Sequence, residues 1–215
     1  MDQLGQSIFL EMFGDPATNP MKWPVVTIGD LLESATYGIS EKAEPEGTLP
    51  ILRMNNITRY GRLNLDDLKF INLIGEDINR YIVQDGDILF NRTNSPELVG
   101  KTAVFRIKNK MAYAGYLIRL RVNSDAFPEY ISSFLNSRYG KLTLRKMCKT
   151  IIGMSNINAT EVQGIKIPKP PVGLQERFFE RLSGIEKTRL TLEESSAKLS
   201  ALFVSIQHRA FKGDL

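Results

Sequence analysis

Cysteine and histidine are nearly absent from this chain of 215 residues, which holds only Cys148 and His208. A single cysteine excludes an internal disulfide and is typical of a reducing compartment, so we expect a cytoplasmic protein. No apolar run is long enough to cross a membrane, and residues 1–11 lack the basic residues of a signal peptide, so we expect no membrane association. No nucleophile is evident beside His208 to form a catalytic pair, so we expect His208 to be a surface residue.

Catalytic motifs are also missing. The sequence has no glycine-rich phosphate loop, zinc-ligand spacing or nucleophile elbow. Asn19-Pro20-Met21-Lys22 does not match the Asn-Pro-Pro-Tyr-like motif of amino-methyltransferases. Asp67-Leu68-Lys69 matches the carboxylate-x-Lys end of many nuclease sites, but no Pro-Asp precedes it. We therefore expect no catalytic residue, metal or cofactor in this chain. The alternative is a stand-alone metal-dependent nuclease or DNA methyltransferase.

Acidic residues are scarce in one region of a chain whose net charge is only +4. Residues 130–171 hold seven basic residues and one acidic residue, Glu161, whereas the rest of the chain is nearly balanced. A local excess of positive charge indicates a polyanionic partner, and a solvated helix face is the alternative. The centre of this region consists of Arg138, Lys141, Arg145, Lys146 and Lys149.

The longest regular pattern is an apolar stripe between residues 174 and 211. Its members recur at steps of four and three, which is the pattern of a coiled-coil seam. At 1.5 Å per residue the helix would be about 57 Å long, and so narrow a stripe is expected to pack against a partner helix. The alternatives are a helix lying on its own domain and a pure coiled-coil assembly protein. The stripe contains Phe178, Leu182, Ile185, Leu192, Leu199, Phe203 and Ile206.

The beginning of the chain repeats part of its end. Ser7-Ile8 and Phe13-Gly14-Asp15 are similar to Ser205-Ile206 and Phe211-Lys212-Gly213-Asp214. We therefore predict that residues 1–15 are the tail of a preceding helix of the same kind. Gly14 is suited to its C-cap. The predicted organisation continues with a linker at 16–24, a globular domain at 25–171 and the long helix at 172–215.

The globular domain is predicted to be α+β, with short strands and long polar loops. Runs rich in apolar and β-branched residues predict the strands, and residues 101–107 and 112–122 are expected to form a hairpin. One helix is expected to begin at Asp125, with apolar residues that include Leu142 on its inner side and Lys149 on its basic side. Residues 151–156 are expected to form a loop. The strands are expected near residues 31–37, 49–54, 68–71, 88–90, 101–107, 112–122 and 165–167.

Side chains that suit base edges are concentrated at the predicted strand ends, where binding residues are common. Arginine pairs with guanine and asparagine with adenine; ordinary turn chemistry is the alternative. We expect Arg92 and Asn94 to contact bases, and Lys141, Arg145 and Lys149 to contact phosphates. The full set of candidate DNA-binding residues is Tyr37, Ser40, Arg53, Asn55, Asn56, Arg59, Tyr60, Arg92, Asn94, Ser95, Lys101, Arg138, Lys141, Arg145, Lys149, Ser155 and Asn156.

Several stretches together, in this order and spacing, resemble the DNA-specificity subunit of type I restriction–modification enzymes. They are Leu-Pro-Ile-Leu-Arg-Met-Asn-Asn-Ile at 49–57, Gly-Asp-Ile-Leu-Phe-Asn-Arg at 86–92, Val-Gly-Lys-Thr-Ala at 99–103, Ile-Lys-Ile-Pro-Lys-Pro-Pro at 165–171 with Leu-Gln-Glu at 174–176, and Arg-Ala-Phe-Lys-Gly at 209–213. The family often has Glu-Gln after the prolines, where this chain has Leu-Gln-Glu.

The resemblance implies a target recognition domain followed by a conserved spacer helix, which is half of a full subunit. Such a subunit is not an enzyme. It recognises one half of a split double-stranded DNA sequence with each domain and packs its two helices antiparallel. It docks methyltransferase (M) subunits that use S-adenosylmethionine, and the complex recruits the restriction (R) subunit, which needs ATP and Mg²⁺. This chain is expected to be the second half of a longer protein or a natural half-subunit, which would form a homodimer through the long helix.

Overall fold

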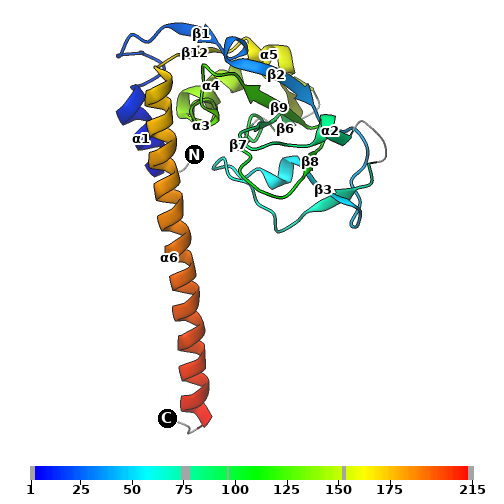
Figure 1. Cartoon of the computed structure of the whole chain (residues 1–215), viewed down its shortest axis with the longest axis vertical. Coiled ribbons are helices and arrows are strands. Elements are labelled where there is room, and N and C mark those ends of the chain that lie inside the picture. Colours follow the sequence, from blue (N-terminus) through cyan, green and yellow to red (C-terminus); the bar gives the residue numbers. More distant parts are fainter. Residues whose placement is uncertain (1–2, 74–77, 96, 152–153, 213–215) are drawn as a thin grey trace. The chain divides into compact units, whose positions relative to one another are not determined.

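The structure is a computed structural model that describes residues 3–73, 78–95, 97–151 and 154–212. The side chains of residues 149–151, 154 and 210 lie outside this description. The chain forms two compact units, Met1–Phe178 and Phe179–Leu215. Figure 1 shows that the first unit contains the strands and short helices, and that the second unit is part of the long helix α6. The α+β class predicted from the sequence is confirmed.

The main sheet of the first unit has the strand order β2-β9-β5-β7, and all its strands are antiparallel. All four residues of β5 are buried, so β5 takes a central place. The predicted hairpin between residues 101–107 and 112–122 is wrong, because β5 lies between β7 and β9. The strands are β2 (Leu32–Tyr37), β5 (Ile88–Asn91), β7 (Thr102–Val104) and β9 (Leu117–Val122).

A second sheet has the order β4-β3-β8, in which β3 pairs antiparallel with β4 and parallel with β8. Its strands are β3 (Leu49–Leu52), β4 (Lys69–Ile71) and β8 (Ala112–Tyr113). The two sheets share one apolar core, which contains Leu52 of β3, Leu89 of β5, Tyr113 of β8 and Leu117 of β9. Burial of a large apolar side chain contributes about 1.5–3 kcal/mol, so this core holds the two sheets together.

Two smaller pairings complete the strands. Strand β1 (Val25–Thr27) pairs with β12 (Lys166–Pro168). Strand β11 (Met154–Asn156) lies between β10 (Lys149–Ile151) and β6 (Thr93–Asn94). The predicted loop at 151–156 is therefore wrong, because its described residues belong to an antiparallel pair. This pairing brings Asn94 opposite Ser155 and Thr93 opposite Asn156.

The basic region forms two helices instead of one. Helix α3 (Pro128–Asn136) ends before Ser137, whose extended backbone (ψ 163°) breaks the helical path. Helix α4 (Arg138–Met147) then begins, and the Ser137 hydroxyl caps it by accepting a 3.0 Å hydrogen bond from the Gly140 amide. The break turns Leu142 outward, so its predicted inner position is wrong: it is 48% exposed. Lys149 lies in β10 and not on this helix.

The remaining helices of the first unit are short. Helix α5 (Ala159–Gln163) begins with a capping box in which Asn158 and Glu161 bond to each other's backbone amides. Helix α2 (Ile78–Tyr81) precedes the turn into β5. Single 3₁₀ turns occur at Gly29–Leu31 and Met54–Asn56.

Helix α1 (Gln3–Phe13) packs through aromatic side chains. Phe13 lies with its ring centroid 4.8 Å from Tyr130 of α3 and 5.1 Å from Phe178. Phe178 is fully buried in the core of its own unit and packs against the aromatic side chains of α1. Gly14 ends α1 with φ +79° and donates its amide to the Leu10 carbonyl, which confirms the predicted C-cap. The compact unit thus extends beyond the predicted boundary at 171.

The long helix α6 spans Val172–Lys212, which confirms the helix predicted from the stripe. Leu192, Leu199, Phe203 and Ile206 are between 44% and 67% exposed. Arg189 interrupts the stripe and forms ion pairs with Glu186 and Glu193 one turn away on either side. None of the helices within the described residues is both long and apolar enough to span a membrane.

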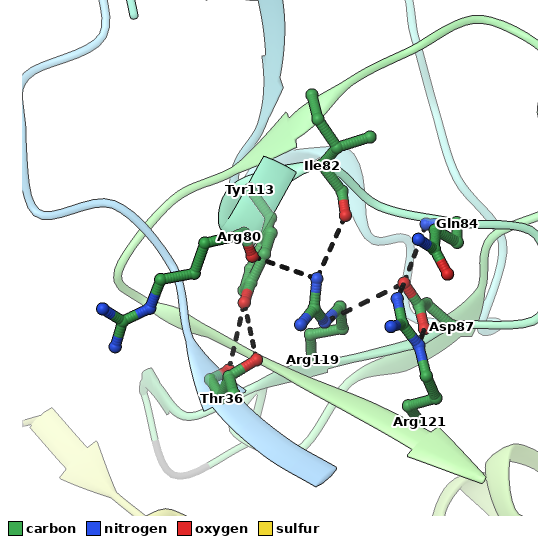
Figure 2. A network of polar contacts seen from close by, with 8 residues as sticks. All are labelled: Thr36, Arg80, Ile82, Gln84, Asp87, Tyr113, Arg119 and Arg121. Carbon is green, nitrogen blue, oxygen red and sulfur yellow. Dashed lines mark hydrogen bonds and ion pairs between the residues drawn. The ribbon is translucent and has the colours of Figure 1, made fainter. Parts of the chain in front are cut away.

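A buried polar network stabilises the turn before β5 (Figure 2). Asp87 is 1% exposed and accepts two hydrogen bonds from Arg121, at 2.8 and 2.9 Å. Arg119 lies 3.9 Å from the same carboxylate and donates to the carbonyls of Arg80 and Ile82. Because a buried carboxylate needs paired charges and hydrogen bonds, this network fixes the loop from α2 to β5. The sequence alone assigned no role to Asp87, Arg119 or Arg121, and the structure shows that they form this network.

Candidate nucleic-acid interface

One pocket of about 230 Å³ combines residues that are distant in the sequence. The turn after Ile57 contributes Arg59 and Tyr60, and helix α4 contributes Lys141 and Arg145. The structure therefore brings together basic candidates that the sequence placed in separate loops and helices. Glu97, Val99 and Asn136 complete the lining.

The turn that carries Arg59 and Tyr60 is held from both sides. Thr58 donates its amide to the Arg62 carbonyl at 2.8 Å, and its hydroxyl accepts from the Arg62 amide at 3.0 Å. Gly61 has φ +80°, and a Cβ there would lie 2.6 Å from the Asn136 amide nitrogen and 2.9 Å from the Thr102 carbonyl. Only glycine fits such an approach, so the turn is pressed against the end of α3.

The opposite wall is built around Gly100, whose φ is +75°. A Cβ at Gly100 would lie 2.5 Å from Leu144 of α4. The Gly100 carbonyl accepts a 2.6 Å hydrogen bond from Lys141 Nζ, and Thr102 Oγ1 donates to the same oxygen at 3.1 Å. The position of α4 against Gly100 is thus fixed by the close approach of the Leu144 side chain and by the hydrogen bond from Lys141.

Two lysines are withdrawn from water beside the pocket: Lys101 is buried and Lys141 is partly buried. Lys101 is 9% exposed and donates to the Met54 carbonyl at 2.9 Å. Burial lowers the pKa of Lys101. Burial, together with the nearby charge of Lys101, lowers the pKa of Lys141 to about 8. The Lys141 ammonium group is thus hydrogen-bonded to the pocket wall, and a phosphate contact by this residue stays a prediction.

The outer members of the pocket are more accessible. Arg59 and Arg145 are exposed, and Tyr60 is 49% exposed. The Arg59 guanidinium carbon lies 5.3 Å from the centroid of the Tyr60 ring, which is a cation–π distance. A hydrogen bond from Ser95 holds the pKa of Glu97 below its usual range, so Glu97 is ionised at neutral pH. The lining therefore contains three cationic side chains and one anionic side chain.

A second group of candidates surrounds strand β6. The Arg92 guanidinium carbon lies 4.8 Å from the centroid of the Tyr37 ring, and the Tyr37 hydroxyl accepts a 2.9 Å hydrogen bond from the Ala159 amide. Arg92 Nε is buried and has no hydrogen-bond partner within the described part of the chain. Asn94 Oδ1 accepts from the Ser95 amide at 2.9 Å. Arg92 is thus stacked on Tyr37 and has no acidic partner among the described residues, whereas the Asn94 side chain is partly used by its own turn.

Met54 connects the two groups. Its carbonyl accepts a hydrogen bond from the Lys101 ammonium group, and its sulfur lies 4.0 Å from the Asn94 side-chain nitrogen. The hydrogen bond between Ser95 and Glu97 also joins the end of β6 to the pocket. The candidates from 92–101 therefore form one continuous region with the pocket.

Two of the candidate DNA-binding residues form hydrogen bonds within their own loop. Asn56 is 2% exposed; its side chain accepts from the Arg53 amide at 2.9 Å and donates to the carbonyls of Asn64 and Asp67. Arg53 donates to the Asp67 carboxylate and carbonyl, both at 2.8 Å. The alternative of ordinary turn chemistry describes the Asn56 side chain, whose polar atoms close this loop, whereas Arg53 Nε is buried without a hydrogen-bond partner among the described residues.

The other candidates divide by exposure. Ser40, Asn55 and Arg138 are exposed, and Tyr37 is 43% exposed. Ser155 is fully buried, so its hydroxyl is not presented to solvent. Asn156 is exposed and accepts a 3.3 Å hydrogen bond from Thr93. The side chain of Lys149 lies outside the described residues.

The pocket also contains residues that sequence reasoning missed: Glu97, Val99 and Asn136. Asn136 donates to the Thr102 carbonyl at 2.7 Å, while its Oδ1 is buried without a partner among the described residues. The one available signal was the Asn136-Ser137 pair, which is suited to a helix boundary. This pair indicates where a helix ends, but it does not indicate that Asn136 lines a pocket.

No group of three or more metal-ligating His, Cys, Asp or Glu side chains occurs among the residues that the structure describes. Asp67, the acidic residue of the nuclease-like tripeptide, is paired with Arg53. The arrangement around the pocket offers cationic and amide donors, and is chemically suited to binding an anion.

Residues 20–200 match the family model described as type I restriction modification DNA specificity domain. The type I restriction enzyme EcoKI specificity subunit of Escherichia coli K12 is 31% identical over 193 residues, which are 86% of this chain and 41% of that protein. The type I restriction enzyme StySPI specificity subunit of Salmonella potsdam is 25% identical over 201 residues, which are 90% of this chain and 43% of that protein. This chain thus spans less than half the length of these relatives.

Among solved structures, the crystal structure of the HsdS subunit from Thermoanaerobacter tengcongensis is similar with a TM-score of 0.57 and 22% identity. The match covers 99% of this chain and 51% of that one. At this identity the likeness concerns the fold alone.

Proposed function

We propose a function for this chain from one premise: it belongs to the family of type I restriction modification DNA specificity domains. The chain recognises one half of a bipartite double-stranded DNA sequence and directs partner methyltransferase and restriction subunits to it. It carries no catalytic residue itself. In this proposal S-adenosylmethionine, ATP and Mg²⁺ belong to the partner subunits, and the complex acts in the cytoplasm.

The observation that supports DNA binding most directly is the cationic pocket. Arg59, Lys141 and Arg145 meet there, and among the described lining residues Glu97 is the one acid. Surfaces that bind DNA combine cationic side chains, which contact phosphates, with side chains that contact base edges. The Arg92 and Asn94 region continues from the pocket and has a guanidinium group without an acidic partner among the described residues. We therefore assign phosphates to the pocket and bases to the loop around β6.

The second unit has a role in assembly. Leu192, Leu199, Phe203 and Ile206 expose apolar surface along α6, and an extended apolar patch indicates a protein interface. We infer that the stripe is covered by a second helix of the same kind, packed antiparallel. In a full subunit this is the other spacer helix, and in this chain alone it is a second copy, which gives a two-fold dimer. The methyltransferase subunits dock on the same helices.

The main alternative, a stand-alone metal-dependent nuclease, is disfavoured by one contact. The Asp67 carboxylate forms a 2.8 Å ion pair with Arg53. Its carboxylate therefore closes a loop and is not part of a cluster of acids that would hold a metal ion.

Substitution of Arg92 tests the proposed function. Arg92→Ala in the assembled methyltransferase should relax the recognised sequence at one position, because loss of a bidentate base contact costs about 1–3 kcal/mol. The measurement is a map of methylated adenines in cells that carry the variant. Arg80→Ala is a matched control, since Arg80 also lies over a tyrosine ring, that of Tyr81 at 5.7 Å. An unchanged sequence and unchanged methylation with Arg92→Ala would disprove the assignment of bases to this loop.

A further inference from the structure

The pocket between the turn at 58–62 and helix α4 has more structure than an exposed basic patch. Its two sides are fixed by Gly61 and Gly100, which both have positive φ and approach neighbouring atoms too closely for any Cβ. One side carries Arg59 and Tyr60, and the other carries Arg145. A ligand between them would therefore contact two segments that the fold already holds in place.

The charges around the pocket are not balanced by the protein. Lys101 and Lys141 lie near enough for the charge of one to affect the other. Each donates to a backbone carbonyl, and neither forms an ion pair with an acid in the described ranges. Burial of a cation without an acidic partner is unfavourable. An anion in the pocket would offset the positive potential of both lysines.

The lining matches a phosphate group in its chemistry. Arginine guanidinium groups donate paired hydrogen bonds to phosphate oxygens, and Arg59 and Arg145 are exposed enough to turn toward a ligand. A volume of about 230 Å³ exceeds the ~30 Å³ share of one water several-fold. Tyr60 adds an apolar face that is suited to the sugar beside a phosphate. These features favour an anionic ligand over a metal cation, and a phosphate group fits them.

We propose that this pocket holds a single backbone phosphate of the DNA target, bound between Arg59 and Arg145, with Lys141 as a partly buried positive charge behind them. The inference rests on the proposed function, because it takes DNA as the source of the phosphate. It adds one defined contact point, which fixes the register of the domain on the duplex while the β6 loop contacts bases. Glu97 weakens this site, since its carboxylate competes for Arg145.

The test uses the assembled methyltransferase complex and duplexes that carry its mapped target sequence. A neutral methylphosphonate replaces one backbone phosphate at a time, and the dissociation constant is measured for each duplex. With the unmodified chain, one position should weaken binding most. In Arg145→Ala that position should lose its effect, and the slope of log affinity against log salt should fall by about 0.9. The methylated sequence should stay the same.

Lys146→Ala is the matched control, because it removes the same charge from the next residue of α4 without touching the pocket lining. It should keep the methylphosphonate profile of the unmodified chain. Glu97→Gln should tighten binding to the unmodified duplex. A profile for Arg145→Ala that equals that of Lys146→Ala would overturn the phosphate site, while the proposed function would stand as long as the target is still methylated.

A free nucleotide is the other source of a phosphate group. Thermal unfolding of the complex with added ATP, and separately with inorganic phosphate, distinguishes the two sources. We expect no stabilisation that depends on Arg145. Stabilisation by ATP that Arg145→Ala abolishes, together with an unchanged methylphosphonate profile, would overturn the DNA assignment. If instead the methylated sequence proves independent of this chain, the proposed function itself fails.

Discussion

Lys141 should reduce the stability of the fold that contains it, and Lys141→Met tests this. Burial and the charge of Lys101 lower the pKa of Lys141 from 10.5 to about 8. One pKa unit corresponds to about 1.4 kcal/mol, so the charged form is disfavoured in the folded chain by about 3 kcal/mol at most. Partial solvent access reduces this figure. Lys141→Met also loses the hydrogen bond to the Gly100 carbonyl, which offsets about 1 kcal/mol of the expected gain in stability.

Methionine retains the length and packing of the lysine stem, and the Gly100 carbonyl keeps Thr102 Oγ1 as a donor. The free energy of unfolding of Lys141→Met should therefore rise by about 1 kcal/mol at pH 7, which is within the range of single buried polar groups. Urea unfolding of the free chain measures the change. In the assembled complex the same variant should bind DNA more weakly, because the positive charge behind the phosphate is gone.

The pH dependence of the free energy of unfolding tests independently whether Lys141 destabilises the fold. Between about pH 8 and pH 10.5 the unfolded chain keeps the proton of Lys141 while the folded chain loses it, so stability of the unmodified chain rises with pH in this window. The advantage of Lys141→Met should be complete below pH 8 and should shrink as the pH rises toward 10. A variant that is less stable at pH 7, or an advantage that is constant from pH 7 to pH 10, would refute the reasoning.

The remaining predictions concern the buried network and the long helix. Asp87→Asn should lower the free energy of unfolding by about 3–5 kcal/mol, because it leaves the buried Arg119 and the partly buried Arg121 without their carboxylate. The exposed Asp85→Asn should change the free energy of unfolding by less than about 1 kcal/mol. Urea unfolding measures both variants, and equal effects would contradict the role of the network. Leu199→Glu should weaken self-association of the chain in sedimentation at tens of micromolar (about ten times a micromolar dissociation constant), while Lys198→Glu should not. A chain that is monomeric without any substitution would rule out the helix dimer.

Features that depend on neighbouring residues could be predicted from the sequence. The apolar stripe predicted α6, because residues three and four apart share one face of a helix whatever the rest of the fold does. Gly14 after Phe13 predicted the end of α1, and the apolar run at 88–90 predicted the central strand. The family resemblance also came from sequence, since it depends on the order of short motifs along the chain.

Pairing and burial were decided by the tertiary structure. The sequence could not show that β5 separates β7 from β9, because many pairings satisfy the same alternation of side chains. It also could not show that Asn56 closes its own loop or that Phe178 packs against α1. The sequence shows that Asn56 is polar and that Phe178 is apolar. The contacts of each side chain depend on residues that are distant in the sequence.

The candidate site shows the same division. Composition alone located the basic region, because charge is a property of each residue. The pocket itself exists because Gly61 and Gly100 bring a turn and a helix from distant parts of the chain together around Asn136. That packing decides which basic side chains face solvent and which are withdrawn from it. No local sequence pattern could therefore show that Lys141 is less exposed than Arg145. Sequence by itself determined the residue types available for DNA, and tertiary structure decided which of them share one pocket.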